Sequence, residues 1–104
     1  MTLFDDREKA EERRFVDAQT AAFRIRARRN RLVGLWAAEL IGLHHELAAG
    51  YAADLVRFDA DEANDDGLIA KLRADLAHLG VSEHRIRHQL DVQSALAREQ
   101  LQQR

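Results

Sequence analysis

The chain of 104 residues contains no proline and only five glycines. Because these two residues interrupt helices and form most turns of loop-rich and all-β folds, their scarcity favours long helices with few breaks. Alanine, the strongest helix former, supplies 18 of the apolar side chains but fills a core poorly. The sequence therefore predicts an all-α domain with a thin core.

Apolar residues at helical spacing divide the chain into four helices. We expect the first over about residues 5–41, the second over 44–60, the third from 64 or 65 to 79, and the fourth from a cap at Ser82. The breaks are Gly42, an acidic linker over residues 59–66, and Gly80. The prediction is a small four-helix bundle, with Trp36 as a core anchor and an apolar face of the second helix that includes Leu47, Tyr51, Leu55 and Phe58.

Residues 5–14 read DDREKAEERR and are polar on every side. Such a helix buries nothing, and isolated helices of about ten residues are marginal in water. We therefore expect the N-terminal part of the long first helix to be frayed or disordered in the free protein, and to order on a partner. A solvated extension without a role is the alternative. The expected division is a conditionally helical arm over residues 1–19 and a helical bundle over 20–104.

Five arginines lie within residues 24–31, although the whole chain has a net charge of −2. On a helix Arg24, Arg28 and Arg31 share one face, and Arg29 falls near the apolar face. Three interpretations stay open: a basic face that pairs with the acidic middle of the same chain, docking on an acidic protein surface, and contacts with nucleic acid phosphates.

Several chemistries are excluded or disfavoured. The absence of cysteine excludes disulfides, thiol catalysis and Cys-ligated metals. His84 and His88 are four residues apart and could share a metal, but they lack an HExxH arrangement, so we interpret them as surface histidines. No phosphate-binding loop or paired nucleophile and base is present, so we expect no enzyme and no metal. The longest apolar stretch is too short to span a bilayer, and no targeting segment is visible, which favours a cytoplasmic protein.

Two strings go beyond composition. One is FDDREKA over residues 4–10, followed by Glu12 and Phe15; the other is ARRNRL over 27–32, then GLWAAE over 34–39 and Gly42-Leu43. With Tyr51-Ala52, Asp75-Leu76 and AREQ over 97–100, they resemble the ζ subunit family of α-proteobacterial F-type ATP synthases, also catalogued as a domain of unknown function. The combination is specific and covers nearly the whole chain at matching spacing. The chain departs from the family pattern in a thinner acidic run after Phe15 and in the additional Arg24 and Arg26.

The resemblance implies a four-helix bundle whose N-terminal segment inhibits ATP hydrolysis by the F1 sector, entering the catalytic interface between its α and β subunits beside γ. The inhibitory residues carried over by position are Phe4, Asp5, Asp6, Arg7, Glu8, Lys9, Glu12 and Phe15. The candidate docking residues are Arg28, Arg29, Asn30 and Arg31.

The implied partners are the F1 α, β and γ subunits, without nucleic acid or direct membrane insertion. A free monomer and a peripheral place on F1 at the inner membrane are expected with them. No cofactor is expected, although weak adenine-nucleotide binding is associated with the family.

Overall fold

The computed structural model describes the backbone of residues 3–59 and 64–102, and the side chains in these ranges except those of 3–11 and 15–17. The chain is all-α, as predicted, and the described residues contain no strand. Four helices follow one another: α1 (Leu3–Ile41), α2 (His45–Phe58), α3 (Asp66–Leu76) and α4 (Glu83–Gln102). A short 3-10 turn, η1 (Ala77–Leu79), extends α3.

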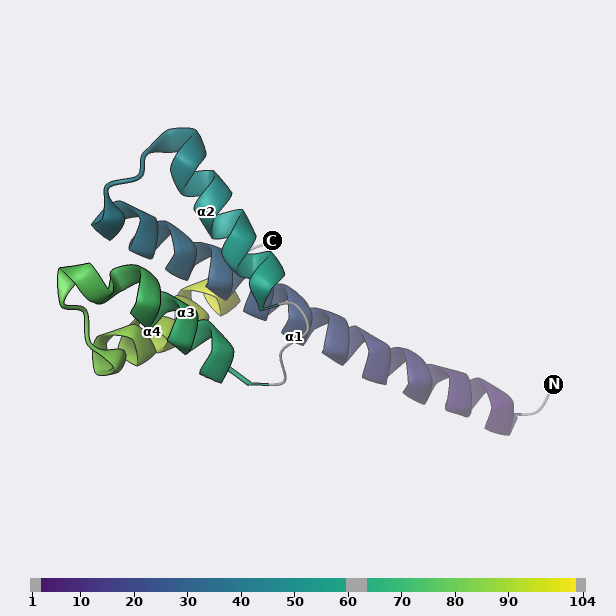
Figure 1. Ribbon diagram of the computed structural model, residues 1–104. Coiled ribbons are helices and arrows are strands. Elements are labelled where there is room, and N and C mark those ends of the chain that lie inside the picture. Colours follow the sequence, from purple (N-terminus) through teal and green to yellow (C-terminus); the bar gives the residue numbers. More distant parts are fainter. Residues whose placement is uncertain (1–2, 60–63, 103–104) are drawn as a thin grey trace.

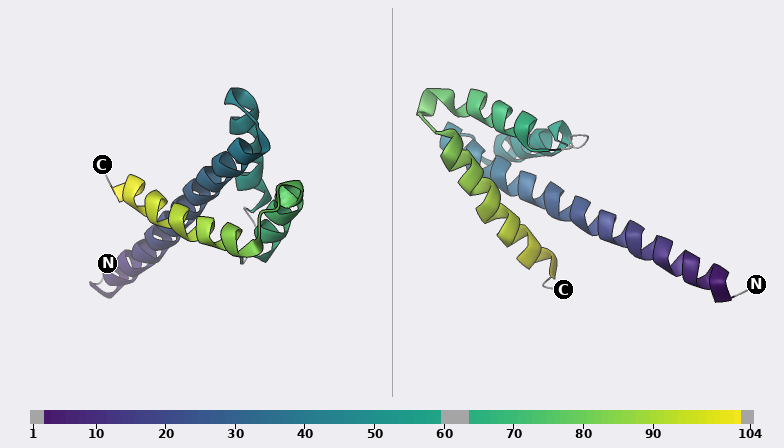
Figure 2. Two further views of the ribbon diagram at one scale, coloured as in Figure 1. Left: turned by 90° about the vertical axis from the view of Figure 1, so that its left-hand side faces the viewer. Right: turned by 90° about the horizontal axis from the view of Figure 1, so that it is seen from below.

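The first helix is 39 residues long and has two different surroundings. Its C-terminal half lies in the bundle, where α2 and α4 pack against it, and its N-terminal half projects away from all the other helices (Figures 1 and 2). The molecule measures 63 × 27 × 20 Å, with a radius of gyration of 17.3 Å. A compact domain of this length has a radius of gyration of about 13 Å. The projecting half of α1 accounts for the elongated shape.

The helix ends follow the capping residues that the sequence indicates. Gly42 has a φ of +94°, and the N–H groups of Gly42 and Leu43 donate to the carbonyls of Glu39 and Ala38 at 3.1 and 2.9 Å. These two bonds form the Schellman motif that satisfies the last carbonyls of a helix. Ser82 accepts a hydrogen bond from the N–H of Arg85 at 3.1 Å and so caps α4, as predicted.

The hydrophobic core lies between the C-terminal half of α1 and the other three helices. Its buried members are Val33, Ala37, Leu55, Leu68, Ile69, Leu72, Leu76, Ile86 and Leu90. Trp36 is only partly buried and packs against this core, so it closes the edge rather than filling the centre. The guanidinium of Arg85 lies over the Trp36 ring, 5.8 Å from its centroid. This is a cation–π distance, so Arg85 contacts the part of the ring that the core does not bury.

The predicted apolar face of α2 is wrong at both ends. Leu47 is 69% exposed and Phe58 is 47% exposed, whereas Ala52 and Leu55 are buried. The face toward α1 is therefore rotated toward small residues. At the closest approach of the two helices, a Cβ added at Gly34 would lie 2.7 Å from the Cα of Ala52. Leu47 and Phe58 stay exposed away from this contact, whereas Leu55 remains buried beside it.

Candidate protein-interaction site

The N-terminal half of α1 carries the residues predicted to form an inhibitory arm. Among them only Glu12 has a described side chain, and it is exposed, as are Arg13 and Arg14. The side chains of Phe4, Asp5, Asp6, Arg7, Glu8, Lys9 and Phe15 lie outside the described ones. From residue 18 to Arg24 every side chain is exposed as well. The described part of this half thus buries no side chain, and only its last residues, up to Arg24, lie beside α2 and α4.

A buried polar cluster lies where α1 leaves the bundle. Asp59, at the C-terminal end of α2, is 1% exposed and accepts hydrogen bonds from Arg26 on both carboxylate oxygens, at 2.8 and 3.1 Å. The amide nitrogen of Asn30 donates to the same carboxylate at 2.6 Å. This bidentate arginine–carboxylate pair is the strong form of a charge-assisted hydrogen bond. It attaches the end of α2 to α1.

The acidic linker returns to the same place on α1. Arg29 donates to both carboxylate oxygens of Asp65 at 2.8 and 3.1 Å, and its Nε donates to Asn30 at 2.9 Å. The hydrogen bonds from Arg29 hold the pKa of the Asp65 carboxyl below its usual value, against a smaller opposing effect of burial. The two ends of the linker are therefore fixed on one turn of α1.

These contacts correct part of the predicted docking surface. Arg29 and Asn30 were expected to be available to a partner, but they are 9% and 2% exposed and point into the cluster. For Arg26 and Arg29, the interpretation that the basic face pairs with the acidic middle of the chain is confirmed. The reason is register: Arg26, Arg29 and Asn30 lie on the side of α1 that faces α2 and the linker, whereas Arg28 and Arg31 are exposed on another side.

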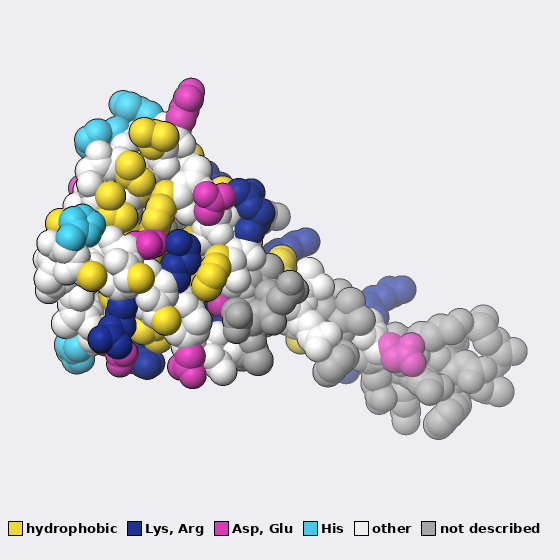
Figure 3. Space-filling model, viewed as in Figure 1, with side chains coloured by type: hydrophobic (Ala, Val, Ile, Leu, Met, Phe, Trp, Pro, Cys, Tyr) yellow, Lys and Arg dark blue, Asp and Glu magenta, His cyan; other side chains and the backbone are white. Residues whose placement is uncertain are grey.

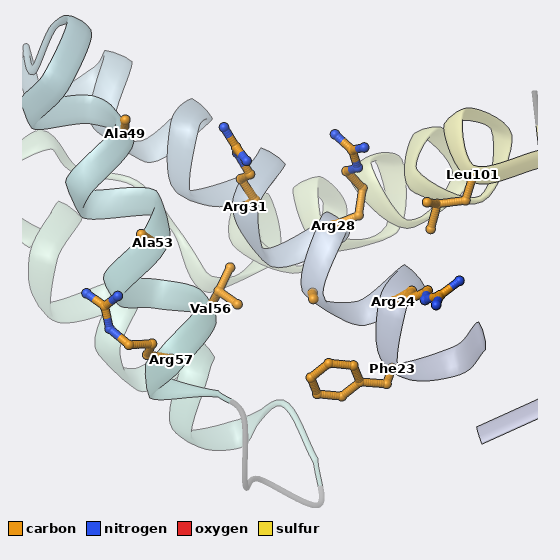
Figure 4. A pocket seen from close by; sticks show the side chains of 10 residues that line it. Phe23, Arg24, Arg28, Arg31, Ala49, Ala53, Val56, Arg57 and Leu101 are labelled. Carbon is orange, nitrogen blue, oxygen red and sulfur yellow. The ribbon is translucent and has the colours of Figure 1, made fainter. Parts of the chain in front are cut away.

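A groove of about 580 Å³ runs beside this cluster between α1, α2 and the end of α4 (Figure 4). Arginine side chains surround it: Arg24, Arg28 and Arg31 from α1, and Arg57 from α2. Its lining is otherwise apolar and mostly small, with Phe23, Ala27, Ala49, Ala53, Val56 and Leu101. Figure 3 shows Lys and Arg side chains where the projecting helix leaves the bundle.

Sequence reasoning missed two parts of this groove. Phe23 is 59% exposed and was not assigned a role, although a large aromatic beside an arginine run on a polar helix was a signal. Arg57 comes from another helix, and no spacing rule along the chain connects it with Arg28.

The two histidines considered for a metal, His84 and His88, lie on α4. His84 and His88 are both exposed, and the described residues contain no group of three or more side chains that could hold a metal ion. Within the same residues, no helix combines the length and apolarity needed to cross a bilayer.

The fold and this surface define a small all-α protein with a projecting helix and a basic groove of otherwise apolar lining on its surface. The family model described as ATPase inhibitor subunit zeta matches residues 1–100. The chain therefore belongs to the ATPase inhibitor subunit zeta family, a family of regulatory proteins.

One solved structure is similar to the chain. It is a solution NMR structure with 36% sequence identity and a TM-score of 0.70, and the match covers 77% of this chain and 93% of that one. The comparison with curated proteins gives no match.

Proposed function

We propose that the chain inhibits ATP hydrolysis by the F1 sector of an F-type ATP synthase, and that its N-terminal arm inserts at the interface of the catalytic α and β subunits beside γ. Family membership supports the inhibitory role. The observation that carries the mechanism is the projection of the first half of α1 from the bundle, with every described side chain from Glu12 to Arg24 exposed.

The arm is suited to blocking movement between subunits. A single helix whose described side chains are exposed is narrow enough to enter a cleft between subunits, and the conformational entropy that it loses on binding weakens binding enough to keep inhibition reversible. Inhibition of this kind requires no chemistry from the chain. In this proposal the bundle remains outside, on the peripheral surface of F1. The contacts with F1 are made by the arm residues Phe4, Asp5, Asp6, Arg7, Glu8, Lys9, Glu12 and Phe15.

The test is ATP hydrolysis by purified F1 titrated with the full chain and with a chain that lacks residues 1–19. The truncated chain keeps every core residue, because the core begins at Val33 and the polar cluster at Arg26. Circular dichroism and thermal unfolding check that it folds. We expect the full chain to inhibit and the truncated chain to lose inhibition. An uninhibited F1 with the full chain, or equal inhibition by the truncated one, would contradict the proposal.

A further inference from the structure

The groove beside the base of the projecting helix contains unpaired positive charge. Arg24, Arg28 and Arg31 are exposed, and none of them has a hydrogen bond or ion pair within the part of the chain that the structure describes. Arg57 pairs with Asp54 at the surface, where such a pair contributes little. Arg26 and Arg29 differ from these three arginines, because each forms an ion pair with an aspartate of the acidic linker.

The three arginines of α1 form a straight row. Their spacing of i, i+4 and i+7 places them on one face of the helix over about 10 Å. A row of this geometry matches carboxylates at the same spacing on a second helix. Arginine favours such a partner because its planar guanidinium binds a carboxylate through two hydrogen bonds.

The side chains that line the groove indicate what kind of partner it can hold. Ala27, Ala49 and Ala53 are small enough for another helix to approach closely, and Phe23 and Val56 add larger apolar side chains to the lining. Phe23 is more than half exposed, so its ring remains available for burial by a partner. An apolar floor beneath a row of arginines fits a helix with apolar residues on one face and carboxylates along its flank.

Nucleic acid fits the groove less well. Two of the five arginines of the 24–31 run are committed to Asp59 and Asp65, and the groove has one aromatic ring for a base to stack on. The apolar alanine floor also offers nothing to a sugar–phosphate backbone.

We propose that this groove binds an acidic amphipathic helix on the surface of the partner assembly, as a second contact separate from the arm. The proposal rests on the proposed function for the identity of the assembly, which is F1. The arm then supplies the block, and the groove supplies affinity by holding the arm at a high effective concentration.

The test uses the full chain and two double variants of equal charge change. One is Arg28→Glu with Arg31→Glu in the groove. The control is Arg73→Glu with Arg87→Glu, two exposed arginines of α3 and α4 that pair with Glu83 outside the groove. Binding to immobilised F1 and inhibition of hydrolysis are both measured, at low and at physiological salt, after circular dichroism has shown that each variant is folded.

The groove variant should bind F1 at least about tenfold more weakly, because two arginine–carboxylate pairs become repulsive. Its inhibition at saturating concentration should stay at the level of the original chain, because the arm is intact. The control should bind like the original chain, and the difference between the two variants should shrink as salt rises. A groove variant as tight as the original chain, or a control as weak as the groove variant, would overturn the proposal.

Two further outcomes separate the inferences. If the original chain binds F1 through the groove but does not inhibit, the inhibitory function fails and the groove assignment stands. If the groove variant keeps its affinity for F1 but loses a salt-dependent affinity of the original chain for duplex DNA or RNA, the groove is a nucleic acid site and the protein-docking proposal is overturned.

Discussion

Between Ile25 and Ile41, α1 contributes Val33, Ala37 and Ala38 to the interior and carries the arginines that bind the linker. Between Glu12 and Arg24 of the same helix, every described side chain is exposed. The backbone is helical throughout, so secondary structure does not separate the two halves. What separates them is burial, since tertiary packing provides most of the stability of helices in proteins. Substitutions in the two halves should therefore affect different properties.

The largest effect on stability is expected at Asp59. Replacing it with alanine removes the buried acceptor that Arg26 and Asn30 share and the carboxylate that lies 3.7 Å from Arg29, which should lower the free energy of unfolding by about 3 kcal/mol. Chemical denaturation followed by circular dichroism measures the change. Asp54→Ala is the matched control on the same helix, because its pair with Arg57 is exposed and should be worth less than about 1 kcal/mol. Similar losses for the two variants would show that the cluster does not hold the packed half.

The next effect is expected at the contact of α1 with α2. Gly34→Ala should destabilise the protein by about 1–3 kcal/mol, because the added Cβ would meet the backbone of Ala52 at 2.7 Å. Gly50→Ala is the control, since a Cβ at that helical position meets nothing within 4 Å and should stabilise the protein by about 0.5–1 kcal/mol. Thermal unfolding shows whether each substitution lowers or raises the stability of the protein. A neutral Gly34→Ala variant would mean that the two helices can separate freely.

A smaller effect is expected from Asp65 and should depend on pH. Because its pKa is lowered in the folded state, its pairing stabilises the protein above the unfolded carboxyl pKa of about 4 and is lost as pH falls through the folded value. Asp65→Asn should therefore cost about 1 kcal/mol near pH 7. The difference from the original chain should shrink below about pH 4. Urea unfolding at pH 7 and pH 3 measures it, and a difference that does not change with pH would contradict the assignment.

The smallest effect on stability is expected in the projecting half. Alanine at Glu12, Arg13 or Arg14 should change the free energy of unfolding by less than about 0.5 kcal/mol, because these side chains are exposed. If the proposed function holds, Glu12→Ala should still weaken inhibition of F1, since Glu12 is one of the proposed contact residues. A loss of stability comparable with that of Gly34→Ala would show that this half is packed against the bundle.

Much of this arrangement could be predicted from the sequence. Missing proline, helical periodicity and the caps at Gly42 and Ser82 indicated four helices close to their observed bounds. Local rules were sufficient there because capping depends on residues within one turn. They were insufficient for α2, where the close approach of Gly34 to Ala52 decides which face is buried and leaves Leu47 exposed.

In the candidate site, too, local sequence rules failed where contacts between different helices decide the arrangement. The arginine run was visible in the sequence, but which of its members pair internally depends on where residues 59 and 65 return to α1. Arg29 and Asn30 were therefore assigned to docking although they are buried. Arg57 was missed because it approaches the groove from another helix, and periodicity along one helix contains no information about its neighbours.

Residue-resolved amide hydrogen exchange of the full chain, free and bound to F1, tests the contrast between the two halves of α1 most directly. We expect strong protection from about Ile25 to Ile41 in the free protein, weak protection from Leu3 to about Thr20, and a large gain in protection of the weak segment on binding. Uniform protection along the whole free helix, or no gain in the projecting half on F1, would contradict it.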